Sequence, residues 1–454
     1  MKKNEKHRLT FLDFRSSGVY IFAVILFLTG IGSCLHGCKE RQEVMVIDRV
    51  PAGFPVNFAL FTKGGRQYVA YYDTAHVMTV ASRVLGAGNW EYKKLDSKVG
   101  WDSHNYVSLF VDDKGYIHLC GNMHSSPLNY FKSRDPWKIS SIVRMDSMVS
   151  NEQVTTYPEF MTGPEGEVLF HYRYGRSGNG FEVYNVLDVE EQCWKRLLDK
   201  PLINGEGQMN AYMQGPVTGP DGYYHLVWVW RDTPDCSSNH TLSYARSRDM
   251  LHWESIKGET VTLPITYSDT VLVVDPTPVK GGLINIGIQL GFDARERPLI
   301  GYHKYDEGGK TQLFLARYEN GGWKKVQQTM WDYRWDFGGW GTIVNELLID
   351  PPYVLPDGDL CFGYHRMDRG NGQVIADGET LRPLREEAYT QSYPQQMDRV
   401  VSDFPGMLVY KIRDKGSSSD GKQYMLRWEA LSPNRDRKPE GKLPSSSALE
   451  LWEW

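Results

Sequence analysis

The sequence predicts an all-β protein, a seven-bladed β-propeller, from its composition and from a unit that recurs along the chain. The 454 residues include 44 glycines, 23 prolines and 13% aromatic residues, a mixture that favours turns and half-buried strands over helices. Charged residues make up 24% and the formal net charge is −5. This balance disfavours a nucleic-acid-binding protein, because such proteins are usually basic.

The recurring unit is a glycine-bearing turn, then a strand of alternating aromatic or aliphatic residues, then a polar or basic tip. The turns are centred on residues 65, 115, 166, 222, 296, 358 and 421. Seven turns at intervals of 50 to 74 residues are typical of a propeller in which each unit is one four-stranded blade. The alternating segment at 448–454 is expected to close the ring.

The first residues predict a secretory leader. Basic residues between positions 2 and 15 precede an apolar stretch at 19–31, which is shorter than the ~20 residues of a transmembrane helix. The stretch ends in Ile31-Gly32-Ser33-Cys34, which resembles a bacterial lipobox with Cys34 as the lipidated residue; Cys38 is a weaker candidate. We expect an exported bacterial lipoprotein, periplasmic or anchored at the outer membrane through its lipid alone, with an uncleaved anchor as the alternative.

Three parts of the chain follow from this pattern. We expect a lipoprotein signal peptide at 1–33, a tether at 34–44 and a single propeller domain at 45–454. The cysteines beyond the tether fit buried small residues better than a disulfide framework, because they are few and widely scattered: Cys120, Cys193, Cys236 and Cys361.

The tips of the repeated strands are the candidate binding site. On a propeller, equivalent strand ends converge on one face. Like charges gathered there repel one another, and an anionic ligand would offset that cost. Carboxylate or sulfate groups held by arginine forks fit best, and the alternative is that each basic group is paired with a nearby acid. The tips carry His124, Arg173, Arg231, His303, Lys304 and Arg366.

Several stretches near these tips combine aromatic rings with polar groups, as sugar-binding sites do. His104 and Asn105 stand at the start of an alternating strand. Similar stretches occur at 210–212, 230–244 and 331–336. From them we take Asn105, His240, Tyr244 and Arg334 as further substrate-binding candidates.

The segments 101–130, 172–180, 230–246 and 302–306 together resemble the BNR-4 type family of seven-bladed propellers. That family includes ulvan lyases and a rhamnosidase group that removes rhamnose from glucuronic acid. The resemblance covers nearly the whole chain after the leader. It implies a carbohydrate-active protein whose partner is an anionic polysaccharide or oligosaccharide that contains uronic acid and is rhamnose-rich or sulfated.

The resemblance also implies catalytic residues. In the lyases of that family, two histidines, a tyrosine and an arginine act on a uronic acid. Carried over, His104 and His124 match the two histidines with the same spacing of 20, and Tyr172 is the best match for the tyrosine. The family's arginine has no counterpart at the matching position, so Arg173 or Arg231 would replace it.

The chemistry of β-elimination gives these residues roles. The proton at C5 of a uronic acid is weakly acidic while the adjacent carboxylate is anionic, so Arg173, Arg231 and His124 would neutralise that charge. A neutral histidine has the basicity to remove the proton near pH 7, and His104 is the candidate. Tyr172 would protonate the leaving oxygen. This chemistry requires no cofactor, while a structural metal ion stays open and its ligands unknown.

Two alternatives remain open. A glycoside hydrolase releasing rhamnose from glucuronic acid glycans would use two carboxylates ~5–9.5 Å apart. In the rhamnosidase group an essential histidine lies at the position that Gln67 matches here. The other alternative is a non-catalytic glycan-binding lipoprotein on the same scaffold, because a fold does not determine a function. The carboxylate candidates for hydrolysis are Asp102, Asp232, Asp235 and Asp336.

Overall fold

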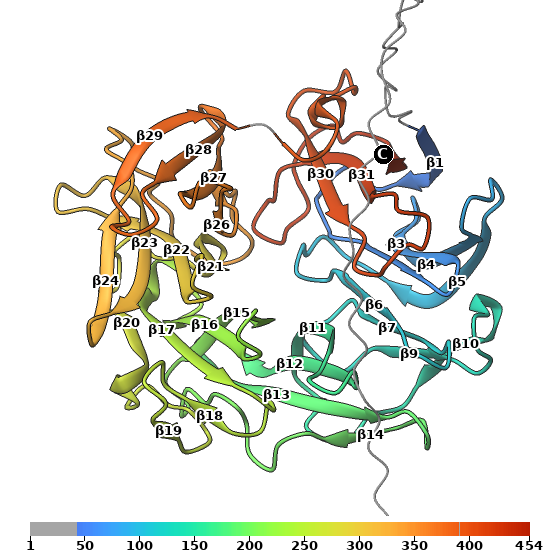
Figure 1. Ribbon diagram of the computed structural model, residues 1–454. Coiled ribbons are helices and arrows are strands. Elements are labelled where there is room, and N and C mark those ends of the chain that lie inside the picture. The colour runs from blue at the N-terminus through green and yellow to red at the C-terminus, as the bar shows by residue number, and fades with distance from the viewer. Residues whose placement is uncertain (1–42, 390) are drawn as a thin grey trace, which may run out of the picture. The chain divides into compact units, whose positions relative to one another are not determined.

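The repeated units fold into seven antiparallel sheets, so the prediction of a seven-bladed β-propeller is confirmed (Figure 1). This computed structural model describes residues 43–389 and 391–454. Each predicted turn leads into the second strand of one sheet. These second strands are β3 (Arg66–Tyr72), β7 (Ile117–Gly121), β12 (Val168–Arg176), β16 (Tyr224–Arg231), β22 (Pro298–Tyr305), β27 (Leu360–Arg366) and β31 (Tyr424–Leu431).

The turns explain why glycine marks the repeat. All seven turn positions have a positive φ, from 61° at Glu296 to 92° at Gly358. Glycine adopts this left-handed conformation without a steric penalty, whereas other residues adopt it rarely. Glu296 is the one turn position among the seven that is not glycine, which is why the fifth copy of the repeat is hard to recognise.

The first strands lie on the inner side of the ring, where neighbouring sheets contact each other, as β2 contacts β6 and β6 contacts β11. They are β2 (Ala59–Lys63), β6 (Val107–Val111), β11 (Thr155–Thr162), β15 (Asn210–Thr218), β21 (Ile288–Phe292), β25 (Leu347–Ile349) and β30 (Met407–Arg413). The third strands are β4 (Val77–Val84), β9 (Tyr130–Ser133), β13 (Asn179–Asp188), β17 (Asn239–Ser247), β23 (Thr311–Glu319), β28 (Gly370–Ala376) and β32 (Ser447–Glu453).

The outer strands and the short elements complete the sheets. The outer strands are β5 (Glu91–Lys98), β10 (Ile142–Met145), β14 (Cys193–Arg196), β18 (Trp253–Glu254), β24 (Gly322–Gln327), β29 (Pro383–Ala388) and β1 (Glu43–Val50). The short strands are β8 (His124–Ser126), β19 (Thr260–Val261), β20 (Val273–Asp275) and β26 (Tyr353–Val354). Single 3₁₀ turns are η1 (Ile139–Ser141), η2 (Cys236–Ser238), η3 (Thr270–Leu272), η4 (Asn285–Gly287) and η5 (Gln395–Asp398).

The two ends of the described chain meet in one sheet. Strand β1 pairs antiparallel with β32, from Glu43 opposite Glu453 to Val50 opposite Ser447. The sheet β1-β32-β31-β30 therefore joins the N-terminal strand to the C-terminal ones and closes the ring, as expected from the alternating segment at 448–454. The core fills the space between sheets, for example where the rings of Phe58 and Trp428 lie 4.7 Å apart.

The expected signal peptide, Cys34 and all but the last two residues of the expected tether lie outside the described residues. Within 43–389 and 391–454, we find no helix that is long and apolar enough to cross a membrane. Cys120, Cys236 and Cys361 are buried free thiols, as expected, whereas Cys193 is an exposed free thiol, so the expectation of a buried residue is wrong for Cys193.

Candidate functional site

Two histidines share one aspartate. His104, from the loop before β6, donates from Nδ1 to Oδ1 of Asp102 at 2.9 Å, and His124, the first residue of β8, donates from Nδ1 to Oδ2 at 2.6 Å. The two imidazole rings stack with their centroids 4.1 Å apart. The side chains are 21% and 27% exposed. Because Nδ1 of each ring is used, Nε2 is the nitrogen that each ring can offer to a ligand.

Two residues from distant loops complete this cluster. Oδ2 of Asp436 lies 3.3 Å from Nδ1 of His104, and the Thr342 hydroxyl donates to Oδ1 of Asp436 at 2.6 Å. The Thr342 hydroxyl also lies 3.1 Å from Nδ1 of His104. Sequence reasoning missed both residues, because neither belongs to a repeat tip or to a recognisable motif.

The surrounding carboxylates keep His104 protonated. Burial by itself would lower its pKa, but hydrogen bonds with Asp102 and Asp436 outweigh burial and raise the pKa to about 9. For Asp102, burial would raise the pKa, but the hydrogen bonds from both histidines hold it far below its usual range. His104 is therefore an imidazolium at neutral pH. This contradicts its expected role as a neutral base and suits it to neutralise an acid.

A tyrosine that sequence reasoning missed lies beside the histidines. Strand β8 pairs with the inner edge of β11, with His124 opposite Thr156, so the next residue, Tyr157, lies at the cluster. Its ring centroid is 6.0 Å from that of His104. Tyr157 has a φ of 59° and sits where the register of β11 with β12 shifts, between Thr156 and Glu159. Burial raises the pKa of Tyr157, so its hydroxyl is protonated at neutral pH.

Two arginines from neighbouring sheets lie behind Tyr157. The Arg173 guanidinium lies 4.9 Å from the centre of the Tyr157 ring and donates to the Tyr212 hydroxyl at 3.2 Å and to the Thr156 hydroxyl at 3.1 Å. The Arg231 guanidinium lies 3.7 Å from the centre of the Tyr212 ring. The structure thus brings four of the predicted site residues together: His104, His124, Arg173 and Arg231.

The arginines set the acidity of Tyr212. Burial would raise its pKa, but the charges of Arg231 and Arg173 outweigh burial and lower the pKa to about 8. Ser177 shares a hydrogen bond with the Tyr212 hydroxyl at 2.6 Å. Tyr212 belongs to the aromatic and polar stretch at 210–212, so the sequence carried a signal for it. Tyr157 had none beyond its position on a first strand.

Tyr172 does not belong to this cluster, so its predicted catalytic role is wrong. Its side chain is fully buried, and its hydroxyl donates to the carbonyl oxygens of Ser150 at 3.1 Å and Asn151 at 3.0 Å. Successive residues of a strand face opposite sides of the sheet, so β12 directs Arg173 toward the site and Tyr172 away from it. Tyr244 is likewise buried, and its hydroxyl lies 2.7 Å from Nδ1 of His225.

Three other predicted site residues are paired with acids near them. Lys304 lies 2.6 Å from Asp275, and Nε2 of His240 lies 2.9 Å from Asp232. Arg366 donates to both oxygens of Asp368, at 2.7 and 2.8 Å. For Lys304 and Arg366 the alternative of separate acid pairing is correct, since an adjacent carboxylate balances each charge. Arg231 behaves differently: its guanidinium donates to side-chain amide oxygens of two asparagines, Asn239 and Asn285.

The remaining candidates have structural surroundings. His303 is fully buried, and burial lowers its pKa to about 4, so it is a neutral core residue and not a cationic contact. Arg334 donates to Asp336 and, with Lys304, lines a separate hollow of about 440 Å³. Asn105 lies next to His104, and its carbonyl oxygen accepts a hydrogen bond from Tyr72 at 2.6 Å.

The histidine cluster also has the composition of a metal site. One ligand atom from each of Asp102, His104, His124 and Asp436 lies within 4.8 Å of the others. The hydrogen bonds above already engage Nδ1 of both histidines with carboxylate oxygens. An ion at these atoms would have to displace those protons, and the four residues satisfy one another without it.

The fold and the site define a β-propeller with a cluster of histidine, tyrosine and arginine at the inner strands of neighbouring blades. The chain belongs to the BNR repeat-containing family, whose model matches residues 66–331. The family resemblance stated from the sequence is therefore confirmed.

Curated relatives are named as lyases. The chain is 22% identical over 381 residues to an "Ulvan Lyase-PL25" of Pseudoalteromonas sp. (strain PLSV), covering 75% of this chain and 70% of the relative. It is 27% identical over 234 residues to the short isoform of an ulvan lyase of Alteromonas sp. (strain LOR), covering 40% of this chain and 44% of the relative. The chain thus spans less than half the length of the second relative.

Solved structures share the fold. An ulvan lyase of the same PL25 family, bound to -[GlcA(1-4)Rha3S]-, matches with a TM-score of 0.57 and 15% identity, over 87% of this chain and 94% of that one. The polysaccharide lyase Uly1 matches with a TM-score of 0.58 and 14% identity, over 88% of this chain and 90% of that one.

Proposed function

We propose that this protein is a polysaccharide lyase that cleaves a uronic-acid-containing glycan by β-elimination. The observation that carries the proposal is the stacked pair of His104 and His124 on Asp102, with the Tyr157 ring beside them. The names of the curated relatives support the reaction class. The ligand printed for one solved relative, a glucuronate linked to a sulfated rhamnose, supports an anionic and sulfated substrate.

The first step is neutralisation of the uronate carboxylate. His104, with a pKa of about 9, is a cation at neutral pH and is exposed enough to contact that carboxylate. A positive charge there acidifies the C5 proton and stabilises the enolate that forms when the proton leaves. Asp102 and Asp436 keep the charge on His104 in place.

Proton removal and proton donation fall to two other groups. Nε2 of His124 accepts the C5 proton, because Asp102 holds the Nδ1 proton of that ring. The electrons of the C5–H bond form a C4–C5 double bond, and the bond between C4 and the glycosidic oxygen breaks. The Tyr157 hydroxyl, protonated at neutral pH, donates its proton to that oxygen. The products are an unsaturated uronate and a shortened glycan.

Arg173 acts through Tyr157 and Tyr212 and does not touch the substrate. Its side chain is only 1% exposed, and its hydrogen bonds go to Thr156 and Tyr212. It is a positioning residue that fixes the Tyr157 ring against its guanidinium and adds positive charge beneath the site. This replaces the expectation that Arg173 itself grips the carboxylate.

Hydrolysis is less well supported. Of the four carboxylate candidates, Asp102 is occupied by the two histidines, Asp232 by His240, and Asp235 by the backbone amides of Ser237 and Gly339. The fourth, Asp336, accepts from Arg334. Gln67, which matches the essential histidine position of the rhamnosidase group, is buried and accepts from Arg83 at 2.7 Å. Neither feature offers an acid and base pair across a sugar.

We further propose that the chain is exported as a lipoprotein, lipidated at Cys34 after removal of residues 1–33. The basic leader, the short apolar stretch and the small residues before Cys34 support this. Substituting Cys34→Ser should abolish incorporation of labelled palmitate and release the protein from the membrane fraction. Labelling that persists in Cys34→Ser and disappears in Cys38→Ser would move the modification to Cys38.

The reaction can be tested with two glycans. The protein, from residue 43 onward, is incubated with ulvan and with rhamnose-capped arabinogalactan. A rise in the ultraviolet absorbance of unsaturated uronate on ulvan supports the lyase. Release of free rhamnose without that absorbance would identify a hydrolase instead. Retarded migration in a glycan gel with neither product would leave a binding protein.

A further inference from the structure

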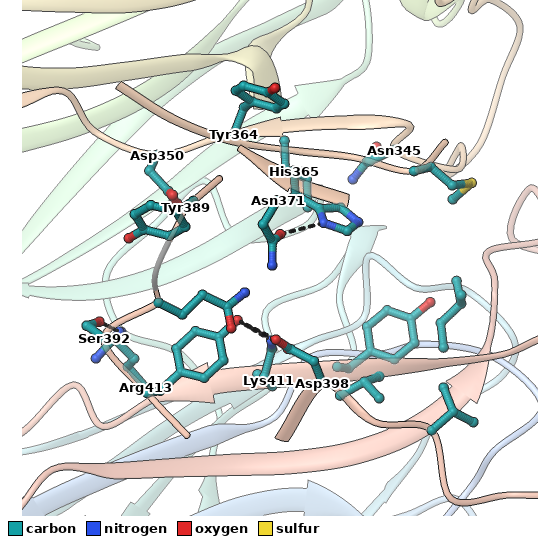
Figure 2. Close-up of a pocket in the computed structure, with 18 of the residues that line it drawn as sticks. Asn345, Asp350, Tyr364, His365, Asn371, Tyr389, Ser392, Asp398, Lys411 and Arg413 are labelled. Carbon is teal, nitrogen blue, oxygen red and sulfur yellow. Dashed lines mark hydrogen bonds and ion pairs between the residues drawn. The ribbon is translucent and has the colours of Figure 1, made fainter. Parts of the chain in front are cut away.

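A hollow away from the histidines lies between two neighbouring sheets. It has a volume of about 690 Å³ and is lined by residues of β25, β27 and β28 on one side and of β30 on the other (Figure 2). A cavity of this size is in the range of ~300–1,000 Å³ that holds small ligands. Nothing in the proposed reaction uses it.

Basic groups enter the hollow from both walls. Nδ1 of His365 lies 2.7 Å from the side-chain amide oxygen of Asn371. Arg413 and Lys411 lie across the hollow from these two residues, on β30 (Figure 2). Arg413 is exposed and donates to the Ser392 hydroxyl at 2.7 Å, but within the described residues it has no carboxylate partner. Its remaining N–H groups are free to bind an acid in a ligand.

Acceptor groups and aromatic rings share the same space. Asp398 is neutralised by Lys411, whose ammonium group also lies 4.2 Å from the centre of the Tyr393 ring. Asp350 is exposed to the hollow, and none of the side chains described hydrogen-bonds to its carboxylate. Partial burial raises the pKa of Asp350, and this effect outweighs the opposing influence of Arg413, His365 and Lys411. Tyrosine faces, a free arginine fork and a free carboxylate are the groups that sugar rings, acid groups and hydroxyls bind.

Two loops connect the lining of the hollow to the histidine cluster along the chain. Asn345 lines the hollow and lies three positions after Thr342 in the chain, and Pro433 lines it and lies three positions before Asp436. Both Thr342 and Asp436 contact Nδ1 of His104. A chain lying over the histidines could therefore continue toward the hollow along these loops. We propose that this hollow binds an acidic sugar segment that flanks the cleaved residue in the same polymer, with a carboxylate or sulfate on Arg413 and His365 and hydroxyls on Asp350. The choice of an acidic glycan rests on the proposed function.

Binding, measured apart from catalysis, tests the inference. Isothermal titration is carried out in the His124→Ala background with a sulfated glucuronate oligosaccharide, and maltohexaose serves as the neutral probe. Arg413→Ala and, separately, His365→Ala should each weaken binding of the acidic oligosaccharide about tenfold. Arg385→Ala is the matched control, because Arg385 is an exposed arginine of the neighbouring β29 that pairs with Glu387 and does not line the hollow. The loss should shrink as salt is added.

The outcomes separate the inference from the proposed function. Unchanged binding in both Arg413→Ala and His365→Ala overturns the inference, whatever the activity of the wild type. Equal affinity for maltohexaose overturns the assignment of an acidic ligand. Weakened binding in the two variants supports the inference even if the wild-type protein forms no unsaturated uronate, a result that would sink the lyase proposal alone.

Discussion

Asp102 determines how both imidazole rings face a ligand. By accepting from Nδ1 of His104 and of His124, it orients both rings and leaves the Nε2 position of each facing a ligand. Asp436 contacts only His104, so the two rings are electrostatically different although they stack. This asymmetry assigns the cationic role to His104 and the basic role to His124.

The raised pKa of His104 predicts how activity and stability depend on pH. Activity should fall as the pH rises through about 9, where His104 loses the charge that neutralises the carboxylate. The folded-state pKa lies above the ordinary 6.5, so the stabilisation from His104 is fully present below about 6.5 and is lost as the pH rises through about 9. Asp436→Asn should move the alkaline limb of a kcat/KM profile to lower pH. An unchanged limb in that variant would contradict the assignment.

Replacing Tyr157 and, in a second variant, Tyr172 by phenylalanine distinguishes a catalytic role from a structural one. Tyr157→Phe removes the proposed proton donor, and kcat should fall by about 100-fold or more with little change in Tm. Tyr172→Phe removes the hydrogen bonds to the carbonyl oxygens of Ser150 and Asn151, both exposed residues, and should cost about 1 kcal/mol of unfolding free energy without a comparable loss of kcat. Steady-state kinetics and thermal unfolding of both variants test this; the reverse pattern would restore Tyr172 as the catalytic tyrosine.

Removal of metal ions tests the interpretation of the cluster as a hydrogen-bonded set. Dialysis against EDTA should leave both kcat and Tm unchanged, because Asp102, His104, His124 and Asp436 satisfy one another. Inductively coupled plasma mass spectrometry measures the metal content of the purified protein. A stoichiometric ion whose loss lowers Tm would show a structural metal at these residues.

At the scale of elements, the repeat predicted the second strands because their turns need glycine, and glycine is visible in a sequence. Strand β11 was not predictable in the same way. Its register shift between Thr156 and Glu159 and the positive φ of Tyr157 turn that side chain toward the histidines. The alternation of apolar and polar residues along a strand, which has a period of two residues, does not reveal such a shift.

The closing strand makes a prediction about stability. Leu449 in β32 is fully buried next to β1, so Leu449→Ala should cost about 2–5 kcal/mol of unfolding free energy. Val46 in the paired strand β1 is 58% exposed, and Val46→Ala should cost no more than about 0.5 kcal/mol. Urea titrations of the two variants measure the difference. Equal, small losses would mean that the β1–β32 pair contributes little to holding the ring closed.

At the scale of the whole molecule, the ring brings together residues that are remote in the chain. Thr342 and His104 are separated by 238 positions yet lie 3.1 Å apart. The sequence predicted the convergence of strand tips correctly for Arg173 and Arg231, because these tips lie on neighbouring blades. It could not predict which tips are paired locally, as Lys304 and Arg366 are, since that depends on side-chain directions in loops.

The account depends most on elimination by the histidine pair. The most direct measurement is the ultraviolet absorbance of unsaturated uronate, followed over time with ulvan and with wild-type protein or His124→Ala, and mass spectrometry of the products. We predict unsaturated ends with the wild type and a loss of at least about 1,000-fold in the variant, with Tm nearly unchanged. Saturated, hydrolysed products, or unsaturated ends formed equally by His124→Ala, would contradict the central claim.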